Sequence, residues 1–215
     1  MQLGADEAGK GPVLGPMVAA AVRAPPSALP DGLDDSKRLS PSRRESLAAK
    51  LRGTSAVSVG VALVEPARID DPETDMNRLT VAAQAEALAA VAQSGDLAVV
   101  DAGDVDEARF GRRVRTAVEA EGPKIDVRSK HRADESHPVV SAASVVAKVE
   151  RDARVAAIAD EYGEVGSGYP SDPTTRTFLR NYVREHDTLP DCARASWQTC
   201  ADVLAAAEQS ALSEF

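Results

Sequence analysis

The chain has 215 residues, of which 43% are hydrophobic and 27% charged, which is enough for one well-buried core. No apolar run approaches the roughly 18 to 20 residues that span a bilayer, and the N-terminus lacks the charged and apolar segments of a secretory signal. We therefore expect a cytoplasmic protein without membrane contact, whose two cysteines, Cys192 and Cys200, remain reduced thiols.

The charge balance is unusual, because 34 acidic residues face 25 basic ones and the net charge is -9. Only 6 of the basic residues are lysines, and aromatic residues make up 3% of the chain. This composition is typical of proteins from salt-loving archaea, where the Debye length falls to about 3 Å and carboxylates repel one another little. An ordinary acidic mesophile protein is the alternative. A negative charge normally argues against a nucleic-acid partner, but that objection weakens in concentrated salt.

Predicted strands and helices alternate along the chain. Short runs rich in Val, Ile, Leu and Ala predict strands at 3–6, 13–22, 56–64, 97–101 and 125–128. Helical spacing and capping residues predict helices at 40–51, 76–92, 106–121, from Pro138 onward, 173–185 and 193–208. Small residues repeat along the helix from Pro138 and predict one packed face that includes Ala153 and Ala157. The order predicts an α/β sheet core over residues 1–162, with a helical C-terminal region over 163–215 packed on the same domain.

Four acidic residues stand where predicted elements begin or end. Asp6 and Glu7 follow a short apolar strand, Asp101 closes another, and Asp134 stands just ahead of the long helix. Carboxylates at the end of a sheet are ligands that Mg²⁺ and Mn²⁺ prefer. Taken singly, each acid is explained at least as well as a turn or helix-capping residue.

Five segments around these acids carry more information than any acid alone. They are DEAGKGPVLGP at 6–16, DSKRLS at 35–40, AD at 133–134 with VVSAASVVAKV at 139–149, RD at 151–152, and GSGYPSDP at 166–173. Together and in this order they closely resemble ribonuclease HII, in particular its archaeal and haloarchaeal members. The resemblance implies a ribonuclease H-like fold, in which helices flank a mixed central sheet.

The resemblance also implies a reaction. By family position, Asp6, Glu7, Asp101 and Asp134 would be the catalytic acids and would hold two divalent metal ions, Mn²⁺ or Mg²⁺, for an in-line hydrolysis. The expected enzyme is a monomeric endonuclease of replication and repair. It would hydrolyse the RNA strand of RNA/DNA hybrids and cut 5′ of ribonucleotides embedded in duplex DNA, leaving 5′-phosphate and 3′-hydroxyl ends.

Substrate-binding residues follow from the same resemblance. Gly9, Lys10 and Gly11 would approach the 2′-hydroxyl, which distinguishes RNA from DNA, and Tyr169 would pack at the next sugar. Two lysines, Lys37 from the DSK segment and Lys148 from the long helix, are candidates to contact phosphates, and the alternative for each is an ordinary solvated or helix-surface lysine.

Two other function classes remain open. A DNA nuclease or resolvase of the same fold would not depend on a 2′-hydroxyl, and a non-catalytic nucleic-acid-binding module would be favoured if one of the four acids were missing. One geometric question also remains. Asp6 and Glu7 are neighbours on a strand, so they can share a metal only if the strand ends or distorts between them. The basic segment at 128–132 would either contact nucleic acid or offset local acid repulsion.

Overall fold

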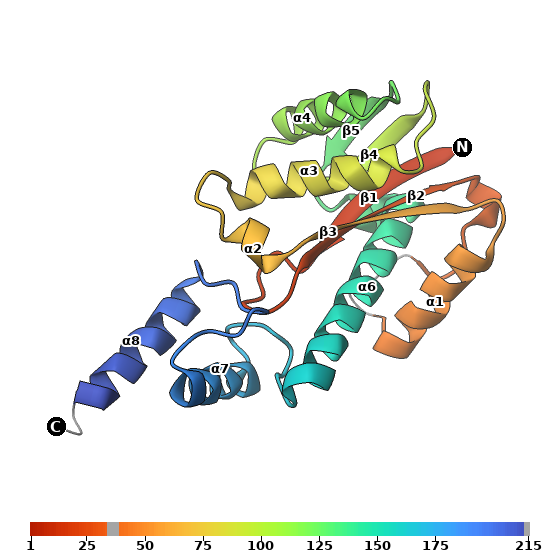
Figure 1. The fold of residues 1–215 in the computed structure, drawn as a ribbon. Helices are drawn as coiled ribbons and strands as arrows, with labels where there is room; N and C mark the ends of the chain where they lie inside the picture. The colour runs from red at the N-terminus through yellow and green to blue at the C-terminus, as the bar shows by residue number, and fades with distance from the viewer. Residues whose placement is uncertain (34–38, 213–215) are drawn as a thin grey trace. The chain divides into compact units, whose positions relative to one another are not determined.

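The computed structural model describes residues 1–33 and 39–212, and its centre is a five-stranded sheet (Figure 1). The strand order is β3-β2-β1-β4-β5. The strands are β1 (Gln2–Ala8), β2 (Met17–Ala24), β3 (Ser58–Val64), β4 (Leu97–Asp101) and β5 (Asp126–Lys130). β1 pairs antiparallel with β2 and parallel with β4, and β4 pairs parallel with β5. The predicted mixed sheet is confirmed.

Helices flank this sheet. They are α1 (Pro41–Gly53), α2 (Pro66–Ile69), α3 (Met76–Ala89), α4 (Glu107–Ala120), α5 (Ala133–Ser136), α6 (Pro138–Tyr162), α7 (Pro173–His186), α8 (Gln198–Leu212) and a 3-10 turn, η1 (Pro26–Ala28). α3 and α4 cover one face of the sheet, and α1 with the first half of α6 covers the other (Figure 1). Within the described ranges, no helix is both long and apolar enough to cross a membrane.

The chain forms two compact units. The first comprises 1–8, 17–63 and 75–151 and holds nearly the whole sheet, and the second comprises 9–16, 64–74 and the chain from Asp152 onward. The predicted division into a catalytic domain over 1–162 and a helical region over 163–215 stays a prediction.

The close packing of α6 on β1 depends on Gly4. A Cβ atom at Gly4 would lie 2.9 Å from Val139 Cγ1 and 2.9 Å from the Val140 backbone nitrogen. The helix therefore lies nearer to the strand than a side chain would allow. Residues 139–147 are buried all round because they lie within the core of the first unit.

The predicted single packed face of this helix was wrong. Ala153 and Ala157, which the spacing placed on that face, are exposed. The reason is that the first half of α6 is buried on every side, so small residues are needed around its whole circumference. The second half is only partly buried.

The strand predicted at 13–22 starts too early. β2 begins at Met17, and Val13 instead donates its backbone N–H to Gly168 O at 2.7 Å. Gly15 has a φ of 76°, so the chain turns before the strand begins. Hydrophobicity alone did not distinguish a buried loop from a buried strand.

The last helix starts later than the predicted 193. Ala193 forms an isolated antiparallel bridge with Leu14, and the Arg194 backbone N–H donates to Val13 O at 2.8 Å. These backbone groups are therefore engaged outside the helix, and α8 begins at Gln198.

Candidate active site

β1 continues without a break through the two adjacent acids. Asp6 pairs with Ala20 and Glu7 with Ala19 in regular antiparallel register with β2. The alternation of a strand therefore directs the two acids to opposite faces of the sheet. The strand neither ends nor loses its register between them, so any site that they share lies around the end of the sheet.

Asp6 lies on the face covered by α6 and is 5% exposed. Burial, and then the charges of Glu7 and Asp101, raise the pKa of Asp6 to about 8. A hydrogen bond with Ser144 and the charge of Lys148 act in the opposite direction. The negative charges of Glu7 and Asp101 thus oppose ionisation of Asp6, an effect that a bound cation would relieve.

Glu7 points toward α3, where Gln84 holds it. The fully buried Gln84 donates from Nε2 to Glu7 Oε2 at 2.5 Å and to Asp101 O at 3.1 Å. One amide group thus connects the Glu7 carboxylate with the end of β4 and restricts its orientation. No motif singled out Gln84 in the sequence. The available signal was one amide within the stretch 79–89 of α3, which is otherwise mostly alanine, leucine and valine.

Asp101 and Asp134 complete the set of acids. Asp101 lies beside Asp6, because both follow directly after the last paired residues of the parallel β1 and β4 strands. Asp101 Oδ1 accepts the Ala133 backbone N–H at 2.6 Å, which anchors α5 to the end of β4. Asp134 is the next residue and is buried. The ends of β1 and β4 and the short helix α5 therefore carry all four predicted acids.

The donor chemistry of these four residues suits a hard divalent cation. All four are carboxylates, and oxygen ligands are what Mg²⁺ and Mn²⁺ prefer. Among the described residues, however, no three acidic, histidine or cysteine side chains lie close enough together to form a complete metal-binding site. The carboxylate chemistry, and the charges of Glu7 and Asp101 that act on Asp6, suit a divalent cation.

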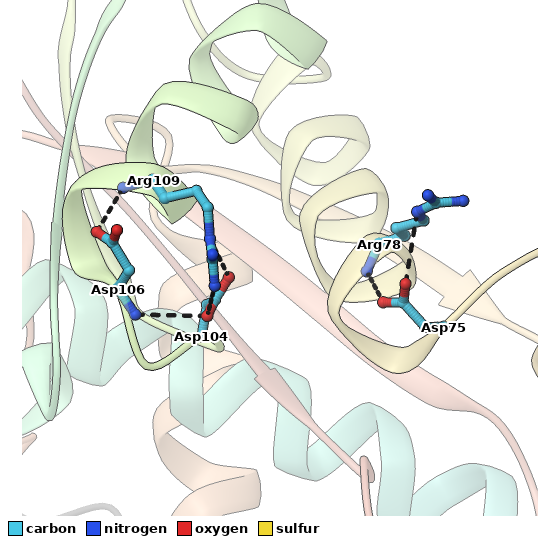
Figure 2. A network of polar contacts seen from close by, with 5 residues as sticks. All are labelled: Asp75, Arg78, Asp104, Asp106 and Arg109. Atoms are coloured by element: carbon cyan, nitrogen blue, oxygen red, sulfur yellow. Dashed lines mark hydrogen bonds and ion pairs between the residues drawn. The ribbon is translucent and has the colours of Figure 1, made fainter.

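Paired charges fix the loop that follows β4 (Figure 2). Arg109 donates from Nη2 to Asp104 Oδ1 at 2.6 Å and from Nε to Asp104 Oδ2 at 3.1 Å, and this guanidinium lowers the pKa of Asp104. Asp106 caps α4 by accepting the Arg109 backbone N–H at 2.9 Å. On α3, Asp75 accepts the Arg78 backbone N–H at 2.8 Å and lies 3.4 Å from Arg78 Nε. Both arginine charges are therefore engaged locally.

The second unit contains the residues that were predicted to bind the substrate sugar. Gly9 is buried with a φ of 84°, whereas Gly11 is exposed. A Cβ atom at Gly11 would lie 3.7 Å from Tyr169 Cε1, so the glycine loop and the tyrosine are neighbours. Tyr169 is 39% exposed. The structure thus brings together the loop at 9–11 and the tyrosine that the resemblance selected.

Arg194 holds this loop in shape. Its fully buried guanidinium donates to Gly9 O at 2.6 Å, to Lys10 O at 2.9 Å and to Gly15 O at 3.0 Å. It also lies 5.5 Å from the ring centre of Trp197. Arg194 could not be singled out from the sequence, because no local pattern connects a residue near the C-terminus with carbonyl groups near the N-terminus.

The two predicted phosphate-binding lysines have different outcomes. Lys148 donates from Nζ to Ser144 Oγ, and its charge acts on Asp6, so it lies beside the acids. Lys37 lies outside the described residues. A phosphate contact stays a prediction for both.

Comparisons with known proteins agree with the resemblance. The model of the family Ribonuclease HII matches residues 3–200. A Ribonuclease HII of Haloarcula marismortui is 61% identical over 215 residues, which is 100% of both chains. The solved ribonuclease H2 of Pyrococcus horikoshii superimposes with a TM-score of 0.87 and 34% identity over 96% of this chain and 98% of that one. The Archaeoglobus fulgidus protein, solved as a PCNA:RNase HII complex, gives a TM-score of 0.83 and 35% identity over 94% and 96%. The chain therefore belongs to the ribonuclease HII family and is a hydrolase of the ribonuclease H type.

Proposed function

We propose that this chain is a monomeric endonuclease that cleaves the RNA strand of RNA/DNA hybrids and cuts 5′ of ribonucleotides embedded in duplex DNA. The observation that carries the proposal is that Asp6, Glu7 and Asp101 stand at the ends of the neighbouring strands β1 and β4, where the charges of Glu7 and Asp101 act on Asp6, while Asp134 lies in α5, which is hydrogen-bonded to Asp101. We assign these four acids to two divalent cations, Mn²⁺ or Mg²⁺.

The protein's own contribution to the reaction is to position these acids. Gln84 orients Glu7, and the Ala133 backbone orients Asp101. Cations held by the four acids would activate a water molecule and stabilise the leaving 3′ oxygen, which would give 5′-phosphate and 3′-hydroxyl ends. Such ends are those that replication and repair require.

Selectivity for RNA over DNA would come from residues of the second unit. Gly9, Lys10 and Gly11 would approach the 2′-hydroxyl with main-chain atoms, and Tyr169 would pack on the next sugar. Two features support this assignment. Arg194 holds the loop through the carbonyl groups of Gly9 and Lys10, and Gly11 and Tyr169 are both exposed side by side.

The test uses duplex DNA that contains one ribonucleotide. In Mn²⁺ or Mg²⁺ and concentrated KCl, we expect one cut 5′ of the ribonucleotide, and no cut with a chelator or with Asp6→Asn, because the carboxylates then lack their cations or one ligand. Analysis of the ends on a sequencing gel identifies the products.

Duplex DNA without ribonucleotides is the control and should stay intact. Equal cutting of that control would instead show a DNA nuclease of the same fold. Binding to the ribonucleotide-containing duplex without any cut would favour the non-catalytic module.

A further inference from the structure

A basic pocket lies at the β5 edge of the sheet, on the side where α4 packs. Its volume is about 420 Å³, and its charged lining residues are Arg112, Arg115, Arg128, Lys130 and Glu107. We call the four basic residues the edge cluster. The pocket lining carries four positive charges and one negative charge, on a chain whose net charge is -9, and one of the four, Arg115, lies 3.9 Å from Glu119 on the same helix.

Positive charge is concentrated in this part of the chain. Residues 109–132 contain eight lysines and arginines and only three acidic residues. Arg109 is neutralised by Asp104, but in the described part of the chain no acidic side chain pairs with Arg112, Arg128 or Lys130. The positive charges that line one pocket repel one another, so the arrangement favours binding of an anionic ligand.

The fold brings these charges together from two elements. A Cβ atom at Gly111 would lie 3.1 Å from Ser129 Cβ, so α4 packs closely on β5 and carries Arg112 and Arg115 to the strand. Ser129 faces α4, and strand alternation therefore turns Arg128 and Lys130 to the other face. The edge cluster thus borders the free edge of the sheet from both sides.

The edge cluster is continuous with the acids. Lys130 is the Cα partner of Asp101 in the parallel β4 and β5 pair, and Arg128 is the partner of Val99. Neighbouring strands lie about 4.8 Å apart, so Lys130 is one strand away from a candidate cation ligand and faces the same side as Asp6. A polyanion cut at the acids would have to pass close to these charges.

We propose that the edge cluster binds phosphate groups of the nucleic-acid strand that flanks the cleaved bond. The inference rests on the ribonuclease H activity and adds a second contact region to it. An acidic chain repels a polyanion, and four carboxylates repel it most strongly at the cut site itself, so local cations beside that site offset the repulsion. Charged residues on an edge strand can alternatively serve only to prevent pairing with other chains.

The test compares two double variants that each remove two positive charges. The first is Arg112→Gln with Arg128→Gln. The matched control is Lys50→Gln with Lys124→Gln, in which Lys50 lies on α1 and Lys124 precedes β5 at the end far from Asp101. Binding of an RNA/DNA hybrid is measured by fluorescence anisotropy in a chelator over a KCl series, and cleavage kinetics are measured separately.

For the edge-cluster variant, we expect the slope of log affinity against log salt to decrease by about 0.7 to 0.9 for each lost phosphate contact. KM should rise on the order of tenfold while kcat stays within about twofold, because the contact lies away from the reacting bond. Removing the hybrid flank that reaches the edge cluster should weaken wild-type binding but leave the variant unchanged. The control variant should match the wild type throughout.

Equal salt slopes in all three proteins would overturn the proposal. Increased self-association of the edge-cluster variant at an unchanged slope would assign these charges to protection of the strand edge. A changed requirement for divalent cations at an unchanged slope would assign them to offsetting the acids. Wild-type binding without cleavage would contradict the nuclease function instead, and the slope comparison would still decide on the edge cluster.

Discussion

Gln84 is the buried polar residue on which the orientation of Glu7 depends. Its Nε2 group serves both Glu7 and the carbonyl group of Asp101, so one side chain joins the ends of two strands. Partners of this kind orient metal-binding carboxylates, and their loss costs about 10 to 100-fold in metal affinity or activity. We therefore regard Gln84 as a positioning residue for the acids.

Gln84→Leu should lower kcat about 10 to 100-fold and raise the concentration of Mn²⁺ needed for half-maximal activity, because Glu7 loses its donor. Steady-state cleavage over a metal titration measures both. Thr80→Val is the control, since the Thr80 hydroxyl donates to Met76 O in the same helix and, among the described residues, to none of the four acids. Full activity of Gln84→Leu at an unchanged metal requirement would contradict the role.

At the scale of elements, the close packing of α6 on β1 determines which side chains lie near Asp6. Gly4 lies two residues before Asp6 on the same face of the strand, and Val139 and Val140 pack directly on it. Ser144 and Lys148 then follow along the same helix and act on Asp6. The close approach of one helix thus determines the surroundings of one acid.

Gly4→Ala should destabilise the protein by about 1 to 3 kcal/mol, because the new Cβ would overlap the Val140 backbone. Each kcal/mol lowers Tm by about 2 to 4 °C in a chain of this size, so a thermal melt measures the effect. Gly53→Ala is the matched control, since nothing lies within 4 Å of a Cβ there and the position ends α1. A Gly4→Ala melt that coincides with the control would show that α6 can shift without cost.

At the scale of the whole molecule, the net charge of -9 opposes compaction in dilute buffer. Salt screens this repulsion, and its range falls from about 10 Å at 0.1 M to about 3 Å at 1 M. The abundance of acid over base and the scarcity of lysine are therefore consistent with a protein that works in concentrated salt, as we propose.

Both Tm and hybrid cleavage should increase between 0.1 M and molar KCl, because screening reduces the repulsion between surface carboxylates. Melting curves and initial rates over a KCl series measure the two effects. A ribonuclease H of basic net charge, assayed on the same hybrid, is the comparison and should lose binding as salt rises. A rate that peaks in dilute buffer and vanishes near 1 M would contradict the halophile hypothesis.

The sequence by itself determined the mixed α/β class, the approximate place of each strand along the chain and the family. Strand and helix periodicities are local, so β4 was located at 97–101 and α3 was predicted to start at Met76. The four acids were predicted through the segments around them, because a carboxylate at the end of an element has several ordinary explanations. Boundaries failed at β2 and α8, where contacts between distant residues replaced the local pattern.

Only the tertiary structure decided which residues support these acids and loops. Asp6 and Glu7 face opposite sides of an unbroken strand, so their partners, Ser144 and Gln84, come from helices on opposite faces. Arg194 holds Gly9 across 185 positions of sequence, and the edge cluster forms because α4 packs on β5. The physical reason is the same in each case. Hydrogen bonds and packing between distant segments depend on their separation in space, which the local pattern of a sequence does not contain.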